Sequence, residues 1–346
     1  MSFENQLLKW YLNNKRDLPW RKNKDPYRVW ISEIILQQTR VVQGRKYYKN
    51  FITKFPTINS LASSNESDVL NVWKGLGYYS RAINLHKSSK EIINNFDGTF
   101  PSKYSDIIKL KGVGDYTASA ISSICFNEFN AVVDGNVLRF ISRYKGLKSP
   151  VDKLKSKKKI KEIGNKLIKK TSSPGDFNQA MMEFGALICK PYPDCDICIF
   201  KHNCLAFQKK EVDIIPVKSK KKKLKERFLN FLVFIDRDNK TMVEKRIHKD
   251  IWYKLIQFPL IESKKEIIDI TLNSEFQKFL NFNNITLNKE KQNVNKAKHK
   301  LSHQQLNITF HQFGIIEVAG SGVDVPNLNN YNFPVPITNF INKILI

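Results

Sequence analysis

The sequence predicts two domains of different classes, an all-α domain followed by an α+β domain. Three observations support this prediction. The chain has 346 residues, more than a single domain usually needs. Apolar residues recur at helical spacing over residues 1–208 and at strand spacing from residue 228 onward. A lysine-rich stretch at residues 209–227 separates the two patterns, and we interpret it as a basic interdomain linker.

The composition is strongly basic. Lys and Arg number 58 against 32 Asp and Glu, which gives a net charge of +26. Such a surplus favours a polyanion such as nucleic acid as partner, although a lysine-rich coding bias would also produce it. The N-terminal residues lack the pattern of a secretory signal, and no apolar run approaches the roughly 20 residues of a membrane span. We therefore expect a soluble, cytoplasmic monomer with no membrane partner.

The first chemically interesting segment is an amphipathic helix predicted from Tyr27 to Thr39, preceded by a turn at residues 17–21. Its apolar stripe recurs at helical spacing, and Glu33 lies close to that stripe rather than opposite it. Most helix glutamates are exposed carboxylates, so the pattern alone assigns Glu33 no special role.

A glycine turn and an aspartate define the centre of the helical domain. Gly112 and Gly114 lie one residue apart, between an apolar turn and a helix starting near Asp115, and allow a sharp bend. The free N–H groups at the start of that helix suit a phosphate. Asp134 precedes the next amphipathic helix, where aspartate is a preferred N-cap, and donors there would keep it ionised. An ordinary helix–helix turn would also explain the two glycines, and an ordinary N-cap would also explain Asp134.

Four of the five cysteines are clustered in the pattern Cys189-x5-Cys195-x2-Cys198-x5-Cys204. In a reducing compartment such a cluster indicates a metal site rather than disulfides. Four thiolates can hold zinc in a tetrahedral site or a four-iron cluster, and their spacing leaves both open.

The segment after residue 228 predicts a mixture of strands and helices. Strands are expected at residues 228–236, 241–246, 305–310 and 314–318, and helices at residues 262–282 and 337–345.

Taken together, these motifs resemble the helix–hairpin–helix DNA glycosylases, and among them the MutY family of adenine glycosylases. The run from Trp30 to Thr39 is similar to the family's catalytic helix, and residues 132–137 are similar to its catalytic aspartate motif. The resemblance implies that Glu33 is the general acid, that Asp134 stabilises the sugar cation, and that Asn136 orients Asp134. Tyr116 stands where strand-cleaving relatives carry a Schiff-base lysine.

The same resemblance implies residues that bind the base and the DNA. Trp20, Arg21 and Gln179 match positions of the adenine pocket. The positions that match contacts to the lesion or to DNA are Gln38, Thr39, Tyr78, Gly112, Gly114, Ser302 and His303. Tyr78 corresponds to an aromatic wedge between bases. Leu301 replaces an aromatic residue beside Ser302 and His303 in the loop that recognises 8-oxoguanine.

The cysteine segment resembles the family's [4Fe–4S] loop, which implies a structural cluster held by Cys189, Cys195, Cys198 and Cys204. The first gap has five residues where the family usually has six. The C-terminal domain, residues 228–346, resembles a MutT-like domain of the Nudix fold through residues 251–259. It lacks the carboxylate-rich metal helix of a working Nudix hydrolase, so we expect it to bind rather than hydrolyse.

The resemblance therefore implies a monofunctional adenine DNA glycosylase that acts on adenine opposite 8-oxoguanine or guanine in double-stranded DNA, associated with the nucleoid through that DNA. The nearest alternative is an endonuclease III-like glycosylase and AP lyase for oxidised pyrimidines, which Tyr116 and the C-terminal domain disfavour. A silent DNA-binding or redox-sensing iron–sulfur protein is a further alternative, which the pairing of Glu33 with Asp134 disfavours. A Nudix hydrolase with a DNA-binding appendage is also disfavoured, because the sequence lacks the carboxylates that bind the metal in such a hydrolase.

Overall fold

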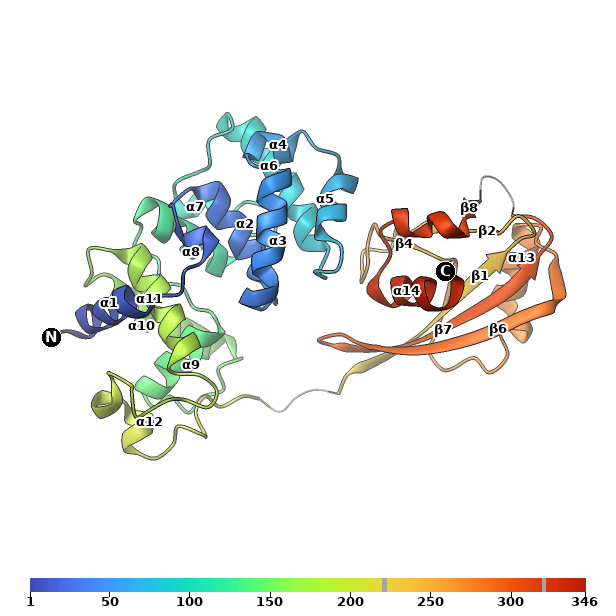
Figure 1. Cartoon of the computed structure of the whole chain (residues 1–346). Helices are drawn as coiled ribbons and strands as arrows, with labels where there is room; N and C mark the ends of the chain where they lie inside the picture. Colours follow the sequence, from blue (N-terminus) through green and yellow to red (C-terminus); the bar gives the residue numbers. More distant parts are fainter. Residues whose placement is uncertain (220–222, 319–321) are drawn as a thin grey trace. The chain divides into compact units, whose positions relative to one another are not determined.

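The computed structural model describes residues 1–219, 223–318 and 322–346, and the chain divides into two compact units (Figure 1). The first unit comprises residues 1–76 and 80–221, and the second comprises residues 77–79 and 222–346. Residues 220–222 of the predicted basic linker lie outside the described part of the chain. Within the described residues, no helix has the length and apolar character needed to cross a membrane.

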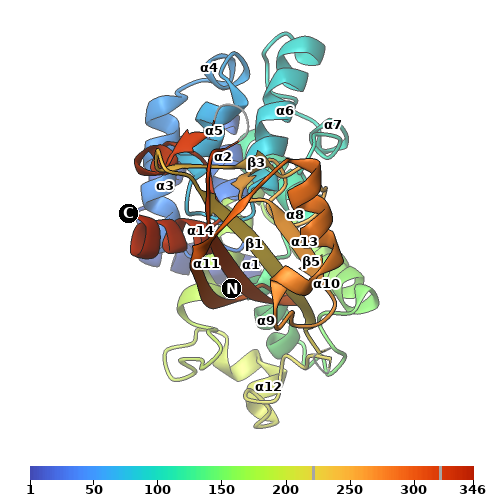
Figure 2. The same cartoon turned by 90° about the vertical axis from the view of Figure 1, so that its right-hand side faces the viewer.

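The first unit is helical, as the sequence predicts, and occupies the blue to yellow-green part of the chain in Figures 1 and 2. Its described elements are α1 (Phe3–Asn14), η1 (Pro19–Arg21), α2 (Pro26–Leu36), α3 (Val41–Lys54), α4 (Ile58–Ala62), α5 (Glu66–Trp73), α6 (Ser80–Phe96), α7 (Tyr104–Ile107), α8 (Asp115–Phe126), α9 (Gly135–Tyr144), α10 (Leu154–Ile168), α11 (Pro174–Leu187), η2 (Lys201–Asn203) and α12 (Leu205–Gln208).

Side chains of α1, α9 and α11 form one core of this unit, with Phe140 and Phe184 in ring contact at 4.7 Å. Helices α9 and α11 approach closely because α11 carries a glycine at the contact. A Cβ added at Gly185 would lie 2.7 Å from the carbonyl oxygen of Asn136. This close packing fixes the start of α9, which carries Asp134 as its N-cap.

The second unit is α+β, as predicted, and contains a sheet with the strand order β6-β7-β1-β2-β8, with β5 pairing β1 outside that order. Strands β1 and β7 run parallel, whereas β6 and β7 form a long antiparallel hairpin, orange in Figure 1. Its described elements are β1 (Lys225–Ile235), β2 (Lys240–Thr241), β3 (Glu244–Lys245), β4 (Ile256–Gln257), β5 (Leu260–Ser263), η3 (Ile270–Leu272), α13 (Ser274–Phe282), β6 (Leu287–Lys300), β7 (Gln304–Ile315), β8 (Val323–Asp324), η4 (Val325–Asn330), α14 (Val335–Phe340) and η5 (Ile341–Leu345).

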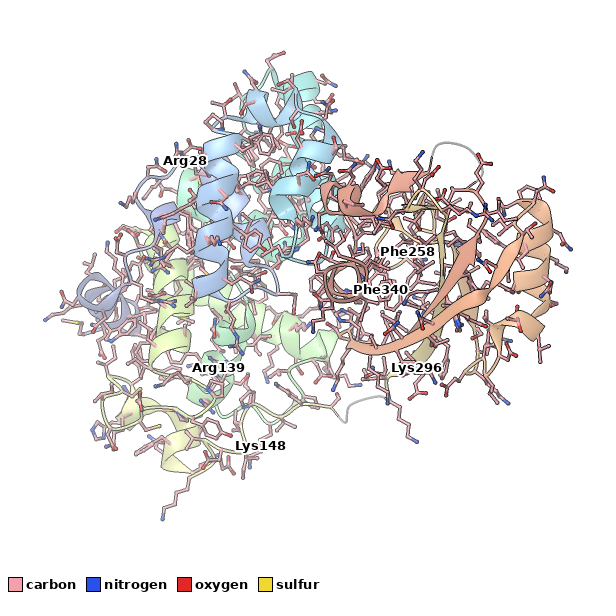
Figure 3. The ribbon with its side chains drawn as sticks, turned by 45° about the vertical axis from the view of Figure 1, so that its right-hand side comes forward. Arg28, Arg139, Lys148, Phe258, Lys296 and Phe340 are labelled. Atoms are coloured by element: carbon pink, nitrogen blue, oxygen red, sulfur yellow. The ribbon has the colours of Figure 1, made fainter. Side chains whose placement is uncertain are left out.

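Strand β1 is buried on both faces, which explains its nearly continuous apolar sequence. Leu229, Phe231 and Val233 face the core that contains α14, whereas Leu232 and Phe234 face the core that contains α13. In the first of these cores the rings of Phe258 and Phe340 meet edge to face at 6.2 Å (Figure 3).

Several predicted boundaries are wrong. The helix expected at residues 262–282 begins only at Ser274, because residues 260–263 pair with β1 as β5. The strand expected at 241–246 splits into β2 and β3, and residues 314–315 are the end of β7. The sequence also failed to reveal β6, an edge strand rich in Lys and Asn, because charged edges that resist aggregation lack a simple apolar alternation. Helix α2 ends at Leu36, three residues before the predicted Thr39.

Candidate active site

A cavity of about 470 Å³ lies among the helices of the first unit. Its walls come from η1 and the loop before it, from α2, α8 and α11, and from the start of α9. The predicted site residues that line it are Trp20, Arg21, Glu33, Thr39, Tyr116, Asp134, Asn136 and Gln179. The fold thus brings together, in one cavity, every residue that the sequence suggested for catalysis and for binding the base.

Glu33 is a buried carboxyl group in the wall of this cavity. Its side chain lies in the middle of α2, and the residue is only 7% exposed. The pKa of Glu33 is raised to about 7, chiefly by burial and also by the Asp134 carboxylate, whereas the Tyr116 hydroxyl and Arg21 oppose the rise. Among the described residues its Oε2 accepts no hydrogen bond. Glu33 can therefore hold a proton near neutral pH and present it to a molecule in the cavity.

Asp134 differs from Glu33 because its carboxylate is fully engaged. Its Oδ1 accepts a hydrogen bond from the backbone N–H of Val137 at 2.7 Å, and its Oδ2 accepts one from Asn136 Nδ2 at 2.7 Å. These bonds make it the N-cap of α9. Burial nevertheless raises the pKa of Asp134, and the donors only oppose that rise. The donors expected at this helix end are present and oppose the effect of burial, and the ionised state of Asp134 stays a prediction.

Tyr116 places a phenol in the cavity at the position where the strand-cleaving glycosylases of the sequence analysis carry a lysine. It extends from the first turn of α8 into the cavity, and its hydroxyl donates to the sulfur of Met182 at 3.5 Å. Burial and the nearby carboxyl groups raise the pKa of Tyr116 well above its ordinary value, so the phenol stays neutral. It offers the cavity a neutral hydroxyl and no nucleophilic nitrogen.

The opposite wall of the cavity is organised by Glu183, which the sequence analysis overlooked. Glu183 is 1% exposed, and its Oε1 accepts from the backbone N–H of Arg16 at 3.0 Å and from Arg16 Nε at 2.7 Å. Its Oε2 accepts from Arg21 Nη2 at 2.8 Å. These bonds hold the pKa of Glu183 down at about 2, although its burial alone would raise it. Glu183 follows Gln179 by four residues on α11, a spacing that places both on one face.

A hydrogen-bonded chain leads from Asp134 to the cysteine segment through Arg139 of α9, which is labelled in Figure 3. Arg139 Nη2 donates to Asn136 Oδ1 at 2.9 Å and to the carbonyl of Gly185, and Arg139 Nε donates to the carbonyl of Cys189 at 2.6 Å. Because Asn136 Oδ1 accepts from Arg139, its Nδ2 must face Asp134. The sequence analysis also missed Arg139, three residues after Asn136.

The four clustered cysteines line one small cavity together with Arg143 and Phe207. Arg143 donates to Cys189 Sγ at 3.6 Å and to the carbonyls of Pro191 and Ile215 at 2.8 and 2.7 Å. The pKa of Cys198 is raised to about 11, chiefly by burial and also by the neighbouring thiols. Over the described residues, no group of three or more His, Cys, Asp or Glu could hold a metal ion. The four thiols thus line a common space.

The predicted DNA-contacting residues lie outside the cavity, except Thr39. Gln38 is exposed beside it, and Tyr78 is 52% exposed. Gly112 has φ +80°, and Gly114 is the N-cap of α8 with open space where a Cβ would be. That open space allows a phosphate to approach the N-terminus of α8.

The remaining predicted pair lies in the second unit. Ser302 and His303 are exposed at the turn of the β6–β7 hairpin, where Leu301 N–H donates to the carbonyl of Gln304 at 2.8 Å. The imidazole of His299, at the base of that turn, lies 6.2 Å from the Trp252 ring. Both hairpin residues are therefore exposed to solvent.

Comparison with known families confirms both folds. Residues 31–170 match the family described as HhH-GPD superfamily base excision DNA repair protein, and residues 230–343 match the NUDIX domain family.

The similar proteins of known name include adenine DNA glycosylases from bacteria and from human. The chain is 37% identical to the adenine DNA glycosylase of Buchnera aphidicola subsp. Schizaphis graminum over 345 residues, which is 97% of this chain and 96% of that protein. It is 38% identical to the human adenine DNA glycosylase over 220 residues, which is 61% of this chain and 40% of the human protein.

Solved structures resemble the first unit. A thermostable thymine-DNA glycosylase, 31% identical, matches with a TM-score of 0.55 over 60% of this chain and 95% of its own. A non-covalent endonuclease III–DNA complex, 21% identical, matches with a TM-score of 0.51 over 60% and 94%. At 21% identity, the similarity to endonuclease III shows a shared fold only.

The Glu183 ion pairs predict a pH-dependent contribution to stability. A carboxyl pKa of about 2, against 4.5 in the ordinary state, corresponds to roughly 3 kcal/mol of stabilisation at neutral pH. Because the folded pKa is depressed, this contribution is complete above about pH 4.5 and is lost as the pH falls toward 2. We expect Glu183→Gln to lower the free energy of unfolding at pH 7, with the difference from the unsubstituted protein narrowing below pH 4.5, as measured by urea denaturation. Glu162→Gln, on an exposed position of α10, serves as the matched control; a pH-independent Glu183 effect would contradict the assignment.

Proposed function

The chain belongs to the adenine DNA glycosylases of the helix–hairpin–helix superfamily and is thus a DNA glycosylase of base excision repair; from this premise we propose that it releases adenine paired with 8-oxoguanine or guanine in double-stranded DNA and leaves the strand uncut. The observation that carries the proposal is a cavity that combines a protonatable Glu33, an engaged Asp134 and a phenol in place of a lysine. We further propose that it acts as a monomer on the nucleoid.

The reaction begins with a base that leaves the duplex. An adenine within stacked DNA cannot reach a buried carboxyl group, so it must be flipped into the cavity at a cost of a few kcal/mol. Once there, it meets a wall of fixed polar groups. Arg21 is held in place by Glu183 at 2.8 Å, so it can bind a base edge without first losing mobility. Gln179, from the same helix as Glu183, supplies an amide that can both donate to and accept from the base.

Glu33 acts as the general acid. Adenine departs poorly as an anion, and protonation at its N7 makes it a neutral leaving group. A carboxylic acid with a pKa of about 7 is still protonated in a large fraction at neutral pH and donates readily, which is the match that general-acid catalysis requires. After the base has left, the carboxylate formed at Glu33 can accept a proton from the attacking water.

Asp134 stabilises the positive charge that develops on the sugar. The carboxylate is held by the Val137 N–H and the Asn136 amide, so its orientation is set before the reaction starts. A cation forming beside it favours its ionised form and reverses the effect of burial on its pKa. As in paired-carboxylate glycosidases, one group gives a proton while the other meets the cation.

Strand cleavage by the lyase route requires an amine that forms a Schiff base with the sugar. Tyr116 occupies the corresponding place and is neutral, so the reaction ends at an abasic site. The second unit, in this proposal, recognises the 8-oxoguanine opposite the adenine through Ser302 and His303 and hydrolyses nothing.

We expect single-turnover assays to release adenine from duplexes with adenine opposite 8-oxoguanine or guanine, with strand breaks appearing only after alkali. Glu33→Gln and Asp134→Asn should each keep DNA binding and lose at least about 10²-fold in rate, the scale of a lost acid or electrostatic group. Glu162→Gln should match the unsubstituted enzyme. Cutting at thymine glycol without alkali would instead support an endonuclease III-like lyase, and near-normal excision by either variant would exclude the assigned roles.

The pKa of Glu33 predicts the pH dependence of excision. Because the protonated form acts, the single-turnover rate should fall as the pH rises through about 7, approaching tenfold per pH unit. A second limb should appear at low pH, where Asp134 becomes protonated. The profile is measured at saturating enzyme, with DNA binding followed separately at each pH. A rate that rises through pH 7 would make Glu33 a base in the limiting step.

We also propose that Cys189, Cys195, Cys198 and Cys204 hold a [4Fe–4S] cluster. When bound, such a cluster joins the four segments of the loop through metal–thiolate bonds. Zinc would need four sulfurs about 2.3 Å from one ion, whereas a cluster spreads its ligands around a larger core. Four thiols that border one small cavity supply the ligands that such a cluster takes, and the family resemblance favours it over zinc.

The purified protein should contain about four iron atoms per chain with inorganic sulfide, since four cysteines ligate one such cluster. Cys198→Ser should lose most of the iron and the visible absorbance, whereas Cys125→Ser, at a cysteine of α8 away from the loop, should retain both. About one zinc per chain in the unsubstituted protein would overturn the iron–sulfur proposal.

A further inference from the structure

Helix α2, which carries Glu33, ends without a residue that breaks helices. Its last residue is Leu36, and the sequence continues with Gln37, Gln38 and Thr39. Glutamine is a good helix former, and neither glycine, asparagine nor proline occurs here. Gln38 nevertheless has φ +58°, in the left-handed region that residues with long side chains rarely adopt. Something outside the local sequence must end the helix.

Arg81 of α6 occupies the place of the missing helical donors. Its Nη1 donates to the carbonyl oxygens of Ile34 at 2.7 Å and of Ile35 at 3.0 Å, and also to that of Gln37. In a continuing α-helix the first two carbonyls would accept from the N–H groups of Gln38 and Thr39. In this structure Thr39 N–H donates instead to Leu36 at 3.1 Å. One guanidinium therefore replaces the hydrogen bonds that would extend α2.

The surroundings of Arg81 explain why it holds this position. The residue is 9% exposed, and its guanidinium lies 5.2 Å from the centre of the Trp73 ring. A buried cation must be paired, and the carbonyls at a helix C-terminus carry the negative end of its dipole. On the other side of the turn, Gln37 Nε2 donates to Thr117 Oγ1 of α8 at 3.2 Å. The turn is thus fixed from two helices.

We propose that Arg81 is a positioning residue that ends α2 at Leu36 and holds residues 37–39 in the conformation that meets the mispair. The inference rests on the proposed function, since Thr39 lines the cavity and Gln38 is exposed beside it. Without Arg81, the freed carbonyls of Ile34 and Ile35 attract the next N–H groups and the helix grows through Gln38. Glu33, one turn earlier, keeps its place, so the change affects engagement of the mispair rather than acid strength.

The test is a double-mutant cycle between Arg81 and Gln38 on the full-length protein. Glycine at position 38 accepts a left-handed conformation by itself, whereas alanine favours the helix. We expect Arg81→Met to lower the single-turnover excision rate about a hundredfold, the effect of a small misplacement in a reacting complex. In the Gln38→Gly background the same substitution should cost less than about tenfold, and in the matched Gln38→Ala background the full loss should remain. The pH midpoint assigned to Glu33 should not move.

Equal losses from Arg81→Met in the Gly and Ala backgrounds would show that Arg81 merely supports the core and would overturn the inference. If Arg81→Met does not fold, Arg81→Lys replaces it, because the lysine side chain ends one bond short of the Nη1 position that donates to the three carbonyls. Hydrogen–deuterium exchange on the free protein provides a readout independent of activity: loss of Arg81 should slow exchange at Gln38 as the helix extends, and faster or unchanged exchange there counts against the inference. Failure of the unsubstituted enzyme to release adenine would reject the proposed function while this exchange result still stands.

Discussion

The site depends on the burial of two carboxyl groups in one cavity. Removal from water raises the pKa of both Glu33 and Asp134, and each negative charge opposes the other. What separates them is the supply of donors. Asp134 receives a backbone N–H and an amide from its own helix, whereas Glu33 Oε2 receives no hydrogen bond within the described residues. Both oxygens of Asp134 thus meet donors that oppose the effect of burial, whereas Glu33 Oε2 meets none, and in the proposed function this difference separates the carboxylate from the acid.

Two arginines at the site are held by hydrogen bonds. Arg21 is paired with Glu183, and Arg139 is bound to Asn136 and to backbone carbonyls. A free guanidinium next to Glu33 would lower the pKa of that acid, and a mobile one would have to be ordered during the reaction. Their hydrogen bonds join them to α11 and to the cysteine segment, and the glycine contact places the start of α9, with Asp134 as its cap, directly against α11.

The sequence predicted features whose interacting residues are close along the chain and missed those whose residues are far apart along it. Local sequence patterns predicted the glycine hairpin, the Asp134 cap and the two fold classes, because each of these depends on neighbours within a few residues. Glu183 meets Arg16 across 167 residues of sequence, and Arg81 reaches the end of α2 across 47. No local pattern records such contacts. The end of α2 was misplaced for this reason, because its own residues favour more helix and a distant arginine opposes them.

The phenol at Tyr116 changes more than the choice between hydrolysis and strand cleavage. A lysine in its place would put a positive charge beside Glu33 and Asp134, and opposite charge lowers the pKa of a carboxyl group. The proton that Glu33 holds at a pKa of about 7 would then be lost at neutral pH. A neutral hydroxyl adds no such charge, although its hydrogen bond opposes the rise of the Glu33 pKa. In the proposed function, protonation of the leaving base by Glu33 and attack on the sugar by an amine at position 116 make opposite demands on the charge of this cavity, and a neutral phenol suits the first.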